Sequence, residues 1–204
     1  MKSESIAYGI AGVAFGLIAG WIIGTQQAVP RTAAAPPQTA AAAPAQNAQS
    51  PRAAILDEAK VTALKSVAER QPTNAQPRVE LANLYFDAER YDDAITWYQE
   101  ALKITPNDVN VSTDLGVCYY YTNQADKALL QLSHSLSVDP NHAKTLLNMG
   151  IVKAFGKQDL EGATKAWEQL VALNPDSPEG QAAKRALDTL RSAHSGGVGQ
   201  KPGG

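Results

Sequence analysis

Cysteine is nearly absent from this 204-residue sequence, and the single Cys118 excludes an internal disulfide. The three histidines are scattered, and none has a cysteine or carboxylate at metal-ligand spacing on a shared helix face. The sequence also has no Gly-rich phosphate loop and no CxxCH haem-attachment motif. No nucleophile stands beside a base that could activate it. We therefore predict that the protein is not an enzyme and that it holds no cofactor and no metal.

An excess of basic charge is also missing. Residues 51–194 hold 15 Lys and Arg against 19 Asp and Glu, which gives a net charge of −4. Because nucleic acids are bound by basic patches or stripes, this balance argues against a nucleic-acid partner.

The N-terminal part of the chain has no charged residue between Glu4 and Arg31. Residues 6–24 read IAYGIAGVAFGLIAGWIIG, which is enough to cross roughly 30 Å of hydrocarbon as a helix. A cleaved signal peptide is the alternative, but its apolar stretch is normally shorter and its cleavage site lies closer. We expect an N-terminal tail over 1–5 and an uncleaved, single-pass transmembrane helix over 6–24.

Small residues recur at every fourth position of this span, at Gly12, Gly16, Gly20 and Gly24. Such GxxxG steps let a second helix pack closely in lipid. They predict a packing face for another copy of the chain or for another membrane subunit. The alternative is that glycine is simply frequent in membrane spans.

Residues 25–50 are rich in alanine and proline and have no apolar pattern, so we expect a flexible linker. A short tail, a span and such a linker are typical of a bacterial inner-membrane protein whose following domain faces the periplasm. We expect that localisation. The count of basic residues on the two sides of the span is nearly balanced, so a cytoplasmic domain is the alternative.

Four prolines punctuate the rest of the chain, at Pro72, Pro106, Pro140 and Pro175, with gaps of 34, 34 and 35 residues. Residues at matching distances before three of these prolines share their size and polarity: Leu81, Ala82, Tyr85, Ala94 and Tyr98; Leu115, Gly116, Tyr119, Ala128 and Leu132; Met149, Gly150, Lys153, Ala163 and Trp167. Because residues three or four apart share a helix face, the pattern predicts paired helices that approach closely at the small residues. We expect the extra residue of the third unit in its turn, over 156–158. Helix starts are expected at Asn74, Asp108, Asn141 and Ser177.

This pattern resembles the tetratricopeptide repeat (TPR) family. It departs from the family where Arg78 and Ser112 replace a common tryptophan and where Lys153 replaces a core tyrosine. The resemblance implies an all-α fold, a right-handed α-solenoid of three TPR units with flanking helices. We place the TPR domain at 51–194, with repeats at 75–108, 109–142 and 143–177, flanking helices at 51–70 and 178–193, and a disordered tail at 195–204. The apolar stripe of the first flanking helix includes Ile55.

In the family, the first helix of each unit lines a concave groove that binds a protein segment. The matching positions here are Val79, Asn83, Phe86, Thr113, Asp114, Val117, Tyr120, Tyr121, Lys144, Leu147, Asn148, Ile151 and Phe155. An apolar stripe of this kind fits an amphipathic helix or an extended apolar segment. The alternative is that a capping helix or the inter-repeat core covers part of it. A carboxylate clamp of the chaperone-binding type is excluded, because Asp114 would repel a carboxylate.

The resemblance implies a membrane-anchored scaffold or adaptor that binds a protein segment and assists assembly of an envelope complex. The alternative is a permanent structural subunit of a membrane complex, held through its glycine-rich span.

Overall fold

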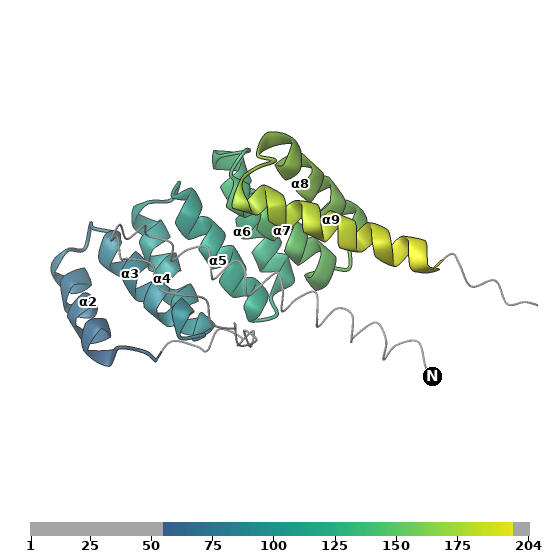
Figure 1. The fold of residues 1–204 in the computed structure, drawn as a ribbon. Coiled ribbons are helices and arrows are strands. Elements are labelled where there is room, and N and C mark those ends of the chain that lie inside the picture. The colour runs from purple at the N-terminus through teal and green to yellow at the C-terminus, as the bar shows by residue number, and fades with distance from the viewer. Residues whose placement is uncertain (1–54, 198–204) are drawn as a thin grey trace, which may run out of the picture. The chain divides into compact units, whose positions relative to one another are not determined.

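The computed structural model describes residues 55–197, and it is all-helical over that range (Figure 1). The described residues form one compact unit. The helices are α2 (Glu58–Arg70), α3 (Gln76–Asp87), α4 (Tyr91–Ile104), α5 (Val109–Tyr121), α6 (Ala125–Val138), α7 (Ala143–Ile151), the π-helical η2 (Val152–Gly156), α8 (Leu160–Leu173) and α9 (Pro178–Gly197).

Within residues 55–197, no helix is both long and apolar enough to cross a bilayer. The expected span over 6–24, its glycine series and the linker over 25–50 lie outside the described residues.

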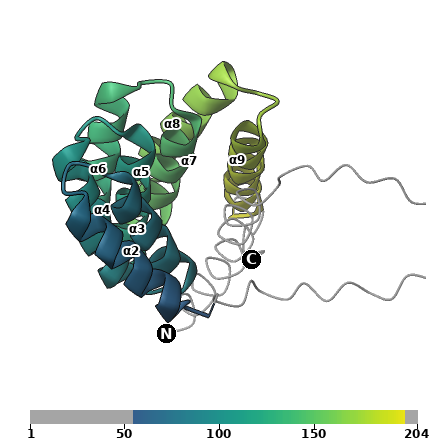
Figure 2. The same cartoon turned by 90° about the vertical axis from the view of Figure 1, so that its left-hand side faces the viewer.

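Consecutive helices pack side by side as three pairs, α3 with α4, α5 with α6 and α7 with α8 (Figures 1 and 2). Each pair also packs on the next, and α2 and α9 cover the two ends through α3 and α8. The small residues Ala82, Ala94, Ala128 and Ala163 are fully buried, as close helix approach requires. The expectation of an all-α, TPR-like solenoid is confirmed.

The three turns within the pairs share one backbone feature. Glu89, Asn123 and Gln158 have φ of 57°, 60° and 56°, in the left-handed region that side chains rarely adopt. Each stands 17 residues before the proline that closes its unit, so the turns repeat in phase. The extra residue of the third unit must therefore lie before Gln158.

The extra residue is taken up at the end of a helix, and our expectation of a longer turn was wrong. After α7 the chain widens into η2, where the amide of Lys157 donates to the carbonyl of Val152, five residues back, at 3.1 Å. The amide of Asp159 then donates to the carbonyl of Lys153 at 2.8 Å. Lys153 holds the expected core position but is only half-buried, and the next residue, Ala154, is buried instead, at 5% exposure. The Lys153 ammonium lies 3.8 Å from the Asp159 carboxylate.

Helix starts follow the expectation at Asp108 and at Ser177, whose hydroxyl accepts from the amide of Gly180 at 3.0 Å, and depart from it elsewhere. Asp108 caps α5, because its carboxylate accepts from the amide of Val111 at 3.0 Å. The cap residue of α7 is His142 instead of Asn141, and that of α3 is Ala75 instead of Asn74.

The two flanking helices also differ from their expected bounds. The first begins at Glu58, capped by Asp57, so Ile55 precedes the helix and is 98% exposed instead of packing. At the other end, α9 continues to Gly197, past residue 193.

Candidate protein-binding groove

The thirteen groove positions expected from the sequence divide into buried and accessible residues. Five are buried at 0 to 6% exposure and cannot serve as contact surface: Thr113, Val117, Leu147, Asn148 and Ile151. The expectation that Val117, Leu147 and Ile151 line an open apolar stripe was therefore wrong. Three of the five lie on α7, which packs against α9 as well as α8 (Figure 1). The burial of these α7 residues is what we expect if α9 caps the last unit by packing on α7.

Polar residues on the first turn of α7 connect it to α5 through a buried network. The hydroxyls of Thr113 and Thr145 lie 2.6 Å apart, and the His142 Nδ1 lies 2.6 Å from the same Thr145 hydroxyl. Thr113 also donates to the carbonyl of Val109 at 2.7 Å. Burial lowers the pKa of His142, opposed by the nearby carboxylate of Asp139. This network fixes the spacing of two repeats and leaves Thr113 no surface to offer a ligand.

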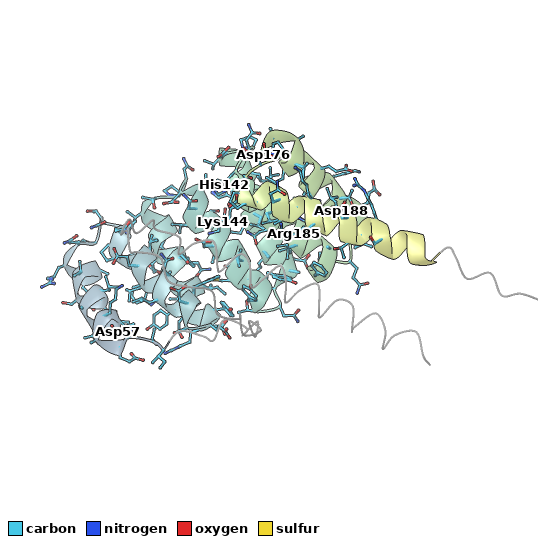
Figure 3. All side chains as sticks on the ribbon, in the orientation of Figure 1. Asp57, His142, Lys144, Asp176, Arg185 and Asp188 are labelled. Carbon is cyan, nitrogen blue, oxygen red and sulfur yellow. The ribbon has the colours of Figure 1, made fainter. Side chains whose placement is uncertain are left out.

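Asp114 and Lys144 form an ion pair across the same two helices, with 2.5 Å between Oδ1 and Nζ and both side chains about one-fifth exposed. Figure 3 labels Lys144 near the start of α7, next to His142. Burial raises the pKa of the Asp114 carboxyl, and the Lys144 ammonium opposes that rise. Because Lys144 is engaged by Asp114, it is not arranged to clamp a carboxylate.

A second carboxylate, Asp87, lies near this pair at the end of α3. Burial first and the Asp114 charge second raise the pKa of Asp87, while Lys60 on α2 lowers it. Asn83, one turn earlier, is exposed, and its side-chain carbonyl accepts from the Tyr98 hydroxyl at 2.6 Å. The middle of the expected groove is therefore polar.

Aromatic side chains gather where α3 and α5 end, and we call Phe86, Tyr91, Tyr120 and Tyr121 the aromatic cluster. Tyr91 stacks on Tyr121 with ring centroids 4.6 Å apart and an angle of 14°. Phe86 meets both rings edge-on, at 5.5 and 6.3 Å. All four residues are half-buried, and burial raises the pKa of Tyr120 to about 12.

Sequence reasoning missed Tyr91, which begins α4 and belongs to the second helix of its pair. The signal that could have found it is its place two residues after the left-handed Glu89, which turns the start of α4 back toward the end of α3. The remaining groove positions, Val79 and Phe155, are half-buried. The accessible apolar surface is thus an aromatic patch at the helix ends instead of a stripe along them.

The described residues give little support for a reactive cysteine or a metal site. Cys118 is fully buried, and burial raises the pKa of its thiol well above the ordinary range. Residues 55–197 contain no group of three or more metal-binding side chains.

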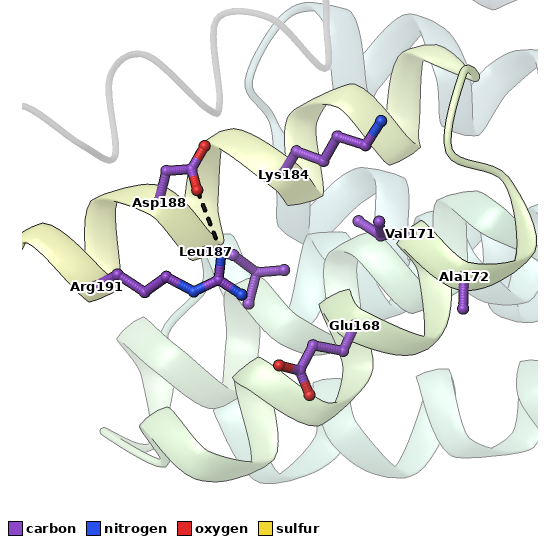
Figure 4. Close-up of a pocket in the computed structure, with 7 residues that line it drawn as sticks. All are labelled: Glu168, Val171, Ala172, Lys184, Leu187, Asp188 and Arg191. Atoms are coloured by element: carbon purple, nitrogen blue, oxygen red, sulfur yellow. Dashed lines mark hydrogen bonds and ion pairs between the residues drawn. The ribbon is translucent and has the colours of Figure 1, made fainter.

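Two cavities lie outside the expected groove, along the surface shared by α8 and α9. One of about 390 Å³ is lined by Glu168, Val171, Ala172, Lys184, Leu187, Asp188 and Arg191 (Figure 4). The other, of about 340 Å³, is lined by Leu160, Glu161, Thr164, Leu190 and Arg191.

Comparison with known proteins gives one family match and many similar folds. A TPR repeat model matches residues 82–122, from α3 to the end of α5. No curated protein shows a significant match.

Among solved structures, the Sgt2 TPR domain from Aspergillus fumigatus is 24% identical with a TM-score of 0.56, covering 64% of this chain and 85% of that one. The first TPR of Spaghetti (RPAP3), solved with the HSP90 peptide SRMEEVD, is 22% identical with a TM-score of 0.53, covering 59% and 95%. MamA is 16% identical with a TM-score of 0.54, covering 66% and 89%. The repeat model thus identifies a TPR repeat over residues 82–122, and the solved structures show that the described residues share the TPR fold.

Proposed function

We propose that this protein is a membrane-anchored adaptor whose TPR domain binds a helical or extended segment of another protein. The observation that carries the proposal is the aromatic cluster, which presents half-buried rings from three helices on one surface. Aromatic side chains dominate the energetics of protein interfaces, because each buries a large area at a small cost in rotamer entropy. The solved RPAP3 domain of similar fold was determined with a bound peptide, which supports a peptide-sized ligand.

The polar middle of the groove indicates the chemistry of such a segment. Two carboxylates lie there, with Lys144 paired to Asp114 and Lys60 near Asp87. An apolar residue would occupy the aromatic cluster, and a neutral or basic residue would face the two carboxylates. A segment that ends in several carboxylates does not fit.

Anchoring is proposed from the apolar run over 6–24, and the linker over 25–50 would let the domain reach partners above the bilayer. Assistance in assembling an envelope complex, with the TPR domain in the periplasm, is the setting that this arrangement favours. A reporter fused after Gln200 tests the sidedness. Extraction by detergent but not by alkaline carbonate tests the anchor.

The binding surface is tested by gentle detergent extraction and identification of the proteins that co-purify. Tyr120→Asp and Tyr121→Asp, both in the aromatic cluster, should abolish capture while the far-UV circular dichroism stays unchanged. Ile151 is unsuitable, because a charge at a residue only 6% exposed would disrupt the fold. Leu130→Asp on α6, which is 73% exposed, is the matched control and should retain capture. Capture that survives both aromatic changes would refute the surface.

A further inference from the structure

The stack ends at α9 without a paired second helix among the described residues. Each earlier first helix is followed by a second helix that packs along it, as α6 packs along α5. For α9, the corresponding place is beside α8, where the two cavities of about 390 and 340 Å³ lie. The α8–α9 surface is thus the place where one more helical layer would continue the stack.

Apolar side chains line this surface and remain partly exposed. Leu160 is 42% exposed, and Val171 and Leu190 are half-buried. They run along the seam between the two helices, with Leu187 buried beneath. An apolar seam with a charged border is the usual construction of a protein interface.

Charged residues of opposite sign lie on the two sides of the seam, and each acidic residue on α8 shares a cavity with a basic residue on α9. Glu161 and Glu168 stand on α8, and Lys184 and Arg191 stand on α9. Glu168 and Lys184 line the same cavity, and Glu161 and Arg191 share the other, so the two helices run antiparallel with acid opposite base (Figure 4). Two of these four charges are engaged within the chain, because Glu161 pairs with Lys165 at 2.6 Å and Arg191 pairs with Asp188 at 3.4 Å. The matched charges that remain are Glu168 and Lys184.

We propose that this surface binds the same surface of a second copy of the chain. A two-fold axis lying along the seam places α8 of one copy over α9 of the other and keeps every residue at its own level. Glu168 of each copy then faces Lys184 of its partner, so that this contact forms twice. An isologous interface needs this self-complementarity, and a surface of one sign would not provide it.

A charge-exchange experiment on the full chain in non-ionic detergent tests the proposal. Glu168→Lys alone should place like charges at both symmetry-related contacts and weaken self-association about ten-fold, and Lys184→Glu alone should do the same. A mixture of the two variants, carrying different tags, should recover the wild-type dissociation constant, because both contacts then join opposite charges. Analytical ultracentrifugation and paired-tag pull-down measure this. Glu69→Lys on α2 is the matched control and should leave the dissociation constant unchanged.

The mixture separates this interface from association through the glycines of residues 6–24, which would not respond to charges on α8 and α9. Wild-type chains that stay monomeric, or single variants that associate as tightly as the wild type, would overturn the proposal. So would a mixture that associates no better than its components. Capture of partner proteins through the aromatic cluster should persist in Glu168→Lys, so failure of this interface is distinguishable from failure of the proposed function.

Discussion

Gly150→Ala should strongly destabilise the solenoid, because the new methyl group would have a rigid neighbour. A Cβ built at Gly150 lies 2.2 Å from Nε1 of Trp167 and 2.5 and 2.6 Å from two ring carbons, where contact requires about 3.5 Å. Trp167 is 1% exposed, and its Nε1 donates to the carbonyl of Leu147 at 3.1 Å. The ring must therefore move by about 1 Å, and that movement breaks its hydrogen bond.

The expected cost follows from three contributions. Overpacking costs about 1–3 kcal/mol, and an unsatisfied buried donor adds about 1–3 kcal/mol. Alanine returns about 1 kcal/mol through its higher helix propensity. Gly150→Ala should thus lower the free energy of unfolding by about 1–5 kcal/mol.

Gly116→Ala is the matched control, since Gly116 holds the same place in the second unit. Its Cβ would lie 2.9 and 3.0 Å from carbons of the Leu132 side chain, which has no hydrogen bond to lose. Here overpacking and propensity nearly cancel, so we expect a loss of roughly 0–1.5 kcal/mol.

Urea unfolding followed by far-UV circular dichroism measures both changes. Adding Trp167→Leu to Gly150→Ala should cost less than Trp167→Leu costs in the wild type, by about 1–3 kcal/mol, because the clash is already removed. Equal losses for Gly116→Ala and Gly150→Ala, or additive losses in the double variant, would refute this reasoning.

Three further changes test single features of the domain. Asp114→Asn should raise thermal stability at pH 7 and leave it unchanged at pH 3. The folded pKa of Asp114 lies above its unfolded pKa, so the stability that the protonated carboxyl contributes is lost as the pH rises through these two pKa values. A variant that is destabilised at pH 7 would show that the pair with Lys144 outweighs burial. Gln158→Gly should stabilise by about 0.5–1 kcal/mol in urea unfolding, because glycine adopts the left-handed φ without strain. Asp108→Ala should destabilise by about 1 kcal/mol in the same assay, because the amide of Val111 loses its cap.

The fold could be predicted from the sequence because its signal is repeated. Proline spacing and the alternation of small and large residues indicate the same helix packing in all three units. A single exception such as Lys153 therefore does not hide the repeat. The start of α2 was misplaced because Ser50-Pro51 is a good start signal in isolation, whereas Asp57 is the residue whose carboxylate accepts from the amide of Lys60.

The candidate site was only partly predictable, since helix periodicity gives the direction of a side chain but not what covers it. Ile151 and Leu147 lie on α7, whose residues we expected to line the groove, yet both are buried, and α9 packs on this helix. Tyr91 was missed because we assigned only first-helix residues to the groove, whereas Tyr91 begins the second helix of its pair.

The π-helical turn at η2 affects how this chain is aligned with related chains. The extra residue is absorbed locally, and the turn at Gln158 stays in phase with the turns at Glu89 and Asn123. Chains that differ by a single residue between Val152 and Gly156 should therefore superpose along their final helices. A gap in an alignment at this place reports a change in local winding, while the surfaces on either side of it remain comparable residue by residue.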